Sequence, residues 1–262
     1  YALSERPDRG YSYGGTIIDI GDVFLNGRTA EESLNALGNT HGSIEYVNGQ
    51  WYVFYHRQTN RTNFSRQACA EKIMITEEGK ICQVEVTSCG LNDGPLLTEG
   101  QYPANICCRL QSALGAVFSH PASMGDKYPY LTQDMNDKEP TEELTAEDEV
   151  CPIQYVANMQ DGSVSGYKYF KNCGANRLSV TVRGETKGWL LVTCGTGKKD
   201  APEMECGRIR VESKGTAWKE YEGEVELPEG VFVLNFCYCG SGRLDFRSFA
   251  FLLDRDKQEG NV

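Results

Sequence analysis

A β-hairpin can be read directly from residues 39–57, which carry the letters NTHGSIEYVNGQWYVFYHR. Two alternating, β-rich stretches, residues 43–47 and 50–56, flank the pair Asn48-Gly49. Asn-Gly between two such stretches is the strongest short-range signal for a hairpin turn. We therefore expect antiparallel sheet here, with His41 at the mouth of the first strand.

Strand patterns continue over most of the chain, and two composition breaks divide it. Residues 1–120 are Gly-punctuated strands, with a segment at 30–37 that could form a short helix. Residues 121–149 form a bridge that ends in the acidic run EPTEELTAEDE, which indicates a solvated loop rather than a calcium site. Strands then recur as in an all-β sandwich. We predict domains at 1–120 and 150–254, a bridge at 121–149 that could hold the first sandwich strand, and a tail at 255–262.

Composition excludes two classes of partner. The formal net charge is −11, and the sequence has no basic stripe. Because affinity for nucleic acid depends on clustered Lys and Arg, a phosphate-backbone binder is disfavoured. The longest apolar runs, such as residues 231–236, are far shorter than the roughly 20 residues that a membrane span needs. The sequence predicts a soluble protein.

The eleven cysteines form no CxxC pair, and their number is odd. This pattern fits neither a zinc ribbon nor a regular disulfide framework. We expect most of them to be buried thiols, with disulfides and metal ligation as the alternatives. Cys237 and Cys239 are two residues apart in a strand and hence share a face. Free thiols favour a reducing compartment, although secretion stays open.

The order of residues in the hairpin resembles a known family. His-Gly, an apolar strand, an Asn-Gly turn and Trp-Tyr-aromatic follow one another, as in the last blade of the five-bladed β-propeller glycosidases of glycoside hydrolase family 43. Residues 64–73, FSRQACAEKI, are similar to the next strand of that family with its arginine, here Arg66. Residues 1–19 resemble the outer half of a preceding blade. The resemblance implies a partial propeller with about three blades upstream of Tyr1.

The same resemblance implies an inverting glycosidase that acts on α-L-arabinofuranosyl or β-D-xylosyl linkages in plant hemicellulose. Inversion needs a carboxylate base and a carboxylic acid about 6.5–9.5 Å apart. Family members carry these groups on earlier blades, and none of Glu5, Glu45 or Glu71 matches them. We therefore predict that the chain does not catalyse by itself.

Two residues of the site are carried over by the resemblance. It implies that His41 faces the axial cavity of the propeller and holds an ion or a water there, while Arg66 lies at the floor of the sugar subsite. Oxygen-rich surroundings would make calcium the fitting ion. His56 and His120 show no partners in the sequence that point to chemistry.

The second half resembles a carbohydrate-binding module of family 6, a jelly-roll β-sandwich. The resemblance rests on DGSVSGYKYF, RLSVTVRG, WLLVTC, GTAWKEYEGEVELPEGVFVLNF and GSGRLDFRSFAF in this order. It implies that Tyr167 and Trp218 sandwich a sugar ring, with Arg243 replacing a polar amide next to them. The alternative is a structural role for both residues, with Trp218 as a core or edge aromatic that covers the sandwich. Asp245 could join a structural calcium or cap a turn.

These features favour the C-terminal portion of a family 43-like glycosidase whose partner is a plant polysaccharide or oligosaccharide. The chief alternative is a non-catalytic carbohydrate-binding protein. A third, an all-β adhesion module, leaves the His-Gly hairpin unexplained. Exposed strand edges would favour self-association or pairing with an N-terminal propeller segment.

Overall fold

The computed structural model describes residues 1–117, 125–134 and 153–253. The helical elements that it labels are short 3₁₀ turns, η1 (Leu25–Gly27), η2 (Ala104–Ile106) and η4 (Gly125–Lys127). The expected all-β class is confirmed. No helix in the described ranges is long and apolar enough to cross a membrane. His120, Cys151, the tail at 255–262 and most of the predicted bridge lie outside those ranges.

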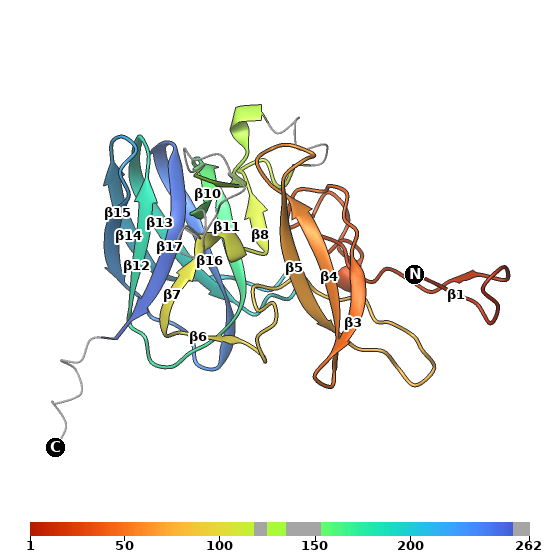
Figure 1. The fold of residues 1–262 in the computed structure, drawn as a ribbon. Coiled ribbons are helices and arrows are strands. Elements are labelled where there is room, and N and C mark those ends of the chain that lie inside the picture. Colours follow the sequence, from red (N-terminus) through yellow and green to blue (C-terminus); the bar gives the residue numbers. More distant parts are fainter. Residues whose placement is uncertain (118–124, 135–152, 254–262) are drawn as a thin grey trace, which may run out of the picture.

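The predicted hairpin forms part of a three-stranded antiparallel sheet, which we call the blade sheet. It consists of β3 (Ser43–Val47), β4 (Gln50–Gln58) and β5 (Arg66–Ile73). Asn48 and Gly49 have φ values of 50° and 84°, the left-handed conformation that a two-residue hairpin turn requires. Val53, Tyr55 and Arg57 alternate along β4 toward the buried face. This sheet is the part of the chain that corresponds to the predicted propeller blade (Figure 1).

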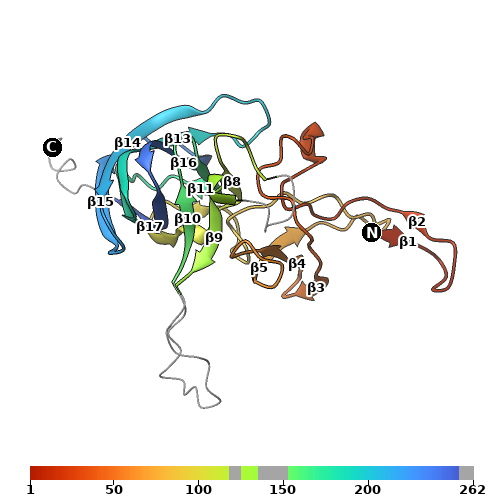
Figure 2. The same ribbon diagram turned by 90° about the horizontal axis from the view of Figure 1, so that it is seen from above.

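The second half is a sandwich of two six-stranded sheets. The first has the order β15-β12-β17-β10-β9, with β7 also paired to β17, and the second the order β14-β13-β16-β11-β6, with β8 also paired to β11. Their bounds are β6 Leu96–Leu97, β7 Gly100–Pro103, β8 Arg109–Gln111, β9 Tyr130–Gln133, β10 Gln154–Met159, β11 Val164–Lys171, β12 Arg177–Arg183, β13 Thr186–Gly195, β14 Met204–Ser213, β15 Lys219–Glu224, β16 Val231–Gly242 and β17 Leu244–Leu252. Figure 2 shows the two layers from above.

Aromatic rings fill the space between the two sheets. Tyr167, Phe236 and Phe249 are fully or almost fully buried, and the centroid of the Phe249 ring lies 4.8 Å from that of Tyr167 and 5.1 Å from that of Phe236. Each such side chain removes 150–250 Å² from water in general, so these rings dominate the stability of the sandwich. The tight core gives the strand ends fixed positions.

The predicted domain boundary at residue 120 is wrong, because the sandwich takes in residues 96–111. β6 and β8 pair with β11, and β7 pairs with β17. These strands have two, three and four residues, too few to show an alternating pattern. β9, at residues 130–133 of the predicted bridge, also belongs to the sandwich through its pairing with β10.

The short helix expected at residues 30–37 is absent, and the segment forms turns instead. Its backbone groups bond to distant residues: the amide of Leu34 donates to Gly21 and that of Leu37 to Val117. The side chain of Ser33 donates to the carbonyl of Asn35, which competes with helical bonding. Residues 1–19 form the hairpin of β1 (Ala2–Leu3) and β2 (Ser12–Tyr13), which projects away from the rest (Figure 1).

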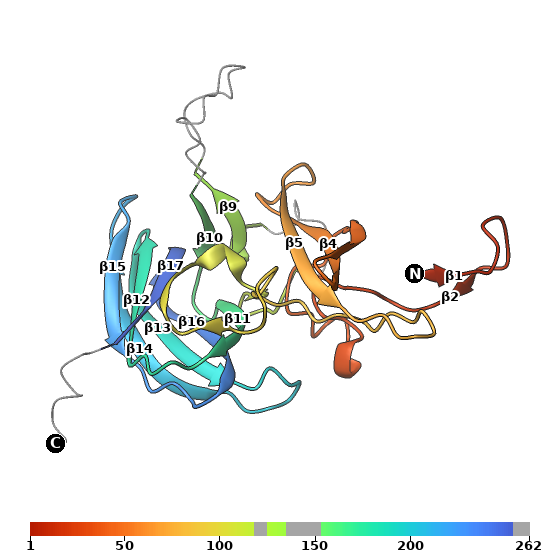
Figure 3. The ribbon, with the colours of Figure 1, turned by 60° about the horizontal axis from the view of Figure 1, so that its bottom comes forward.

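The N-terminal part and the sandwich lie side by side (Figure 3), and two buried cations join them. Lys168 of β11 places its Nζ 2.7 Å from Asp22 Oδ2 and 2.8 Å from Glu85 Oε1. Arg57 of β4 donates to the carbonyls of Asn105 and Cys107 beside the sandwich. Both cations are nearly inaccessible, so these contacts hold the two parts in one arrangement.

The ten cysteines in the described residues are all free thiols, but the expectation that most of them are buried is wrong, since four of the ten are. Cys107, Cys108, Cys194 and Cys206 are buried, whereas Cys82 and Cys173 are exposed. Burial raises the pKa of Cys108 to about 12. Buried thiols of this kind behave as small apolar residues.

Replacing Lys168 tests the junction. We expect Lys168→Met to lower the free energy of unfolding by about 3–5 kcal/mol, because the buried Asp22 carboxylate loses its counter-charge. The double variant Lys168→Met/Asp22→Asn should recover most of this loss in urea denaturation. The control is Lys187→Met, whose exposed pair with Glu212 at 3.5 Å should matter by less than about 1 kcal/mol. Similar losses for Lys168→Met and Lys187→Met would contradict the assignment.

Candidate functional site

A close crossing of the chain over β4 fixes the position of His41. A Cβ atom on Gly42 would lie 1.7 Å from the carbonyl oxygen of Phe54, so only glycine fits after the histidine. The hydroxyl of Thr40 donates to the carbonyl of His56 at 2.7 Å. These two contacts explain why Thr-His-Gly stands at the mouth of the hairpin.

His41 has a partner that the sequence reasoning missed. Its Nδ1 lies 3.0 Å from Nε2 of His56, and the two rings meet edge to face at 85°. Burial, followed by the charges of His41 and Arg66, lowers the pKa of His56. The register of the predicted hairpin could have identified this pair. Ser43 lies opposite Phe54, so continuing the register by two residues places His41 opposite His56.

Arg66 begins β5 opposite Gln58. Its side chain is exposed and donates to the carbonyl of Asn63. His41 lines an open cavity of about 570 Å³ together with Tyr1, Tyr13 and Tyr55, and Arg66 is not among the lining residues. The structure therefore brings Arg66 into the electrostatic surroundings of His56 without placing it in the cavity of His41.

The donors near His41 do not by themselves fit calcium. Calcium takes six to eight oxygen ligands, whereas the contact recorded for His41 is another imidazole. The described residues contain no group of three or more His, Cys, Asp or Glu that could hold a metal. In the sandwich, Asp245 is already engaged by the amide of Asn158 and by Arg183 at 3.1 Å. Asp245 therefore accepts a backbone hydrogen bond from Asn158 and forms an ion pair with Arg183.

Trp218 lies in the loop between β14 and β15, partly exposed, at one end of the first sheet. Its ring meets that of Tyr155 edge-on, with centroids 5.3 Å apart. The guanidinium of Arg183 lies 4.2 Å from the centroid of the Trp218 ring and 4.7 Å from that of Tyr155. Arg183 also binds Asp134 at 2.9 Å and the hydroxyl of Tyr155 at 2.7 Å. The guanidinium of Arg247 also lies near this ring, 5.9 Å from its centroid, so two arginines and Tyr155 surround the partly exposed indole.

Arg243 and Tyr167 differ sharply in accessibility. The side chain of Arg243 is 59% exposed, with its Nη2 3.9 Å from Asp126 at the same end of the sandwich as Asp245. Tyr167 is wholly buried, and its hydroxyl donates to the carbonyl of Ala104. The expectation that Tyr167 stacks on a sugar is wrong, because its ring packs in the core.

A second cavity lies between the blade sheet and residues 86–107, with a volume of about 330 Å³. Glu71 lines it, and burial raises the pKa of its carboxyl to about 7. Thr87 donates to Glu71 from its amide at 2.6 Å and from its hydroxyl at 2.8 Å. Both carboxylate oxygens are thus occupied by protein donors, which indicates a structural group rather than a catalytic acid.

Comparison with known proteins gives one strong match by sequence. The chain is 39% identical over 260 residues to a protein of Thermoclostridium stercorarium named xylosidase/arabinosidase. The match covers 97% of this chain and 51% of the relative. The chain is a homologue of one half of that protein. It spans about half the length of the relative, and no protein-family model matches it. The name agrees with the glycosidase resemblance of the hairpin.

Comparison with solved structures gives matches of low sequence identity. One is a glycoside hydrolase family 43 arabinoxylan arabinofuranohydrolase of Bacillus subtilis in complex with cellotetraose, with 19% identity, a TM-score of 0.49, and coverage of 97% of this chain and 47% of that one. Another is a family 6 carbohydrate-binding module of Clostridium cellulolyticum in complex with xylose, with 10% identity, a TM-score of 0.40, and coverage of 60% and 99%.

The raised pKa of Glu71 predicts a pH dependence of stability. Its folded pKa of about 7 lies above the usual value of 4.5, so the folded state favours the protonated form. Stability from this group is therefore present below pH 4.5 and is lost as the pH rises toward 7. We expect a loss of about 2–3 kcal/mol over this range, which Glu71→Gln should remove.

The measurement is urea denaturation between pH 4.5 and 7.5, with Glu77→Gln as the control for an exposed glutamate on the next hairpin. If Glu71→Gln and the unmodified chain kept the same pH profile, Glu71 would not be the titrating group.

Proposed function

We propose that this chain is part of an inverting glycoside hydrolase of family 43 that releases α-L-arabinofuranosyl or β-D-xylosyl units from hemicellulose. The observation that carries the proposal is the match, along almost the whole chain, to a protein named xylosidase/arabinosidase. The His-Gly hairpin with Arg66 at the start of the next strand is the part of the chain on which the resemblance to this family rests.

In this proposal the chain supplies supporting groups, and the two catalytic carboxylates come from elsewhere in the protein. His41, His56 and Arg66 gather at the mouth of the blade sheet. The N–H groups of the Arg66 guanidinium can donate hydrogen bonds to a sugar hydroxyl. The histidine pair can exchange a proton or orient a water. Calcium near His41 would need six to eight oxygen ligands, and the described residues offer no cluster of three or more His, Cys, Asp or Glu side chains to supply part of them.

The exposed edge of the blade sheet suits a partner made of further propeller strands. β3 pairs only with β4, which leaves one side of its backbone free among the described strands. Tyr46 and Trp51 are 55% and 39% exposed on this hairpin, and their ring centroids are 5.0 Å apart. We propose that further propeller strands, rather than a second copy of the chain, cover this edge.

A second function, glycan binding by the sandwich, is favoured by the end that carries Trp218. A partly exposed indole next to fixed charged groups is suited to the apolar face of a sugar ring and its hydroxyls. The partner in this proposal is a plant polysaccharide or an oligosaccharide, as for the structural neighbours that were solved with cellotetraose and xylose.

Hydrolysis by the isolated chain tests the first proposal. We expect residues 1–262 to show no turnover of aryl α-L-arabinofuranosides or β-D-xylosides, because each missing acid or base typically costs about 10²–10⁴-fold in rate. The full-length relative from Thermoclostridium stercorarium serves as the positive control. Turnover by the chain that Glu71→Gln abolishes would show that the catalytic group had been misplaced.

Calorimetry with xylo-oligosaccharides tests the second proposal. We expect weak binding by the chain, at millimolar to high micromolar dissociation constants, and a loss of about tenfold or more in Trp218→Ala. Trp189→Ala is the matched control, since that indole is also partly exposed, 44%, but lies on the other sheet. Equal effects of the two substitutions, or no heat with any oligomer, would leave Trp218 a structural residue.

A further inference from the structure

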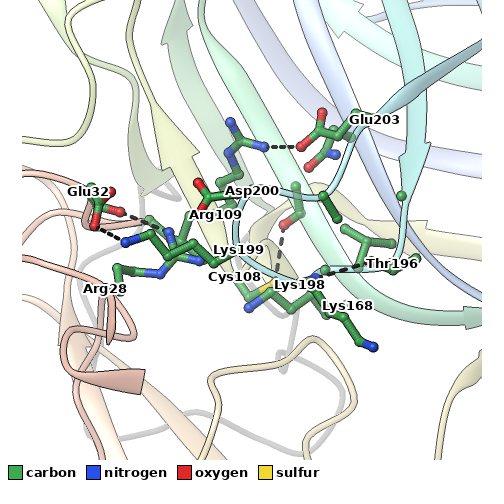
Figure 4. A pocket seen from close by; sticks show the side chains of 17 residues that line it. Arg28, Glu32, Cys108, Arg109, Lys168, Thr196, Lys198, Lys199, Asp200 and Glu203 are labelled. Atoms are coloured by element: carbon green, nitrogen blue, oxygen red, sulfur yellow. Dashed lines mark hydrogen bonds and ion pairs between the residues drawn. The ribbon is translucent and has the colours of Figure 1, made fainter. Parts of the chain in front are cut away.

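A cavity of about 280 Å³ lies where the N-terminal segment meets the second sheet of the sandwich (Figure 4). Arg28 and Glu32 come from the segment after η1, and Asn235 comes from β16. The loop between β13 and β14, residues 196–203, forms the opposite wall. Neither the His41 cavity nor the Trp218 end of the sandwich shares these residues.

The lining is rich in cations although the whole chain carries −11. Five lining residues are basic and three acidic: Arg28, Arg109, Lys168, Lys198 and Lys199 against Glu32, Asp200 and Glu203. Two pairs cancel locally, Lys199 with Glu32 at 2.7 Å and Arg109 with Glu203 at 2.6 Å. The ammonium of Lys168 is bound by Asp22 and Glu85, so it adds no free charge here.

Three polar groups of the lining keep unused bonding capacity. Lys198 has no recorded ion pair among the described residues, and Nε of Arg28 is buried without an acceptor. Asn235 is 1% exposed, and its Oδ1 has no partner. Exchanging the oxygen and nitrogen of that amide would leave the nitrogen free instead, because its one recorded contact is the Thr193 hydroxyl, which donates and accepts.

Buried polar groups without partners are costly, so the grouping of Arg28 Nε and Asn235 Oδ1 around one cavity, beside the exposed Lys198, points to a ligand that satisfies them. Arg28 also donates from Nη1 to the carbonyl of Glu32 at 3.1 Å, so its Nε is the group left without an acceptor. Lys198 and Arg28 outnumber Asp200, the lining carboxylate outside the two pairs, so the cavity favours an anion. Charge-assisted hydrogen bonds to carboxylate are among the strongest in proteins. The neutral amide of Asn235 requires a hydroxyl-bearing group in the same ligand. The volume is close to the lower end for small-molecule sites, about 300 Å³, which suits a single sugar ring.

We propose that this cavity binds a uronic acid, a sugar ring that carries a carboxylate. Lys198 and Arg28 hold the carboxylate, and the side chain of Asn235 binds a ring hydroxyl. The choice of a sugar as the carrier of the carboxylate rests on the proposed function. Binding here needs no hydrolysis, so the two proposals can fail separately.

Calorimetry on the chain at low ionic strength tests this site with D-glucuronate, D-glucose and acetate as probes. We expect binding of D-glucuronate, none of D-glucose at the same concentrations, and weaker binding of acetate. Lys198→Gln should weaken D-glucuronate binding about tenfold, the loss of one charge-assisted hydrogen bond. Added salt should weaken it as well, since Lys198 is exposed to solvent.

Lys214→Gln is the matched control, because Lys214 is an exposed lysine in the β14–β15 loop and does not line the cavity. It should leave the D-glucuronate affinity unchanged. Acetate bound as tightly as D-glucuronate would overturn the sugar assignment. No binding of D-glucuronate, equal binding of D-glucose, or an affinity that Lys198→Gln leaves unchanged would overturn the site. Glycosidase activity tests the proposed function and does not bear on this binding site.

Discussion

The buried ion pair between Lys168 and Asp22 is the contact on which the arrangement of the chain depends. Lys168 belongs to β11, the strand that β6, β8 and β16 join, and Asp22 lies in the N-terminal segment. The second oxygen of Asp22 accepts the amide of Val86 at 2.8 Å. Burial alone would lower the pKa of Lys168, but its neighbours Cys108, Asp22 and Glu85 raise it above its usual value. An arrangement that separated Lys168 from Asp22 would leave a buried charge without its counter-charge, so the pair disfavours other ways of docking the two parts.

This junction also shapes the cavities of the molecule. Lys168 forms part of one wall of the basic cavity, while Arg57 and Glu71 line the cavity on the side of the blade sheet. A displacement of the N-terminal part against the sandwich would therefore change both cavities at once, because each cavity is lined by residues of both parts or of their junction. The two parts are also joined along the chain. Residues 96–111, which precede β9, supply the strands β6, β7 and β8 to the two sheets of the sandwich.

Local chemistry made some features predictable and hid others. The Asn48-Gly49 turn, the strands on either side of it and the position of His41 follow from backbone preferences of a few adjacent residues. The pairing of β6 or β7 with strands roughly 75 to 150 residues later leaves no local pattern, so the boundary was misplaced. Tyr167 was misassigned for a similar reason: a Tyr after Gly reads the same in the sequence whether its strand faces the core or a ligand. The cluster of Arg28, Lys198 and Asn235 is likewise a product of tertiary contact between three distant segments.

The unequal burial of the thiols has a chemical consequence. Thiolate is the reactive form of cysteine, and burial suppresses it at Cys69, Cys107 and Cys108, whose pKa values are all raised. Cys82 and Cys173 are exposed, one in the N-terminal part and one in the sandwich. Among the ten described cysteines, mild alkylating reagents will therefore reach these two sulfurs first. The described residues thus carry, without any engineering, one attachment point for a spectroscopic label on each side of the Lys168 junction, and the distance between the two labels reports directly on how rigidly the halves are held.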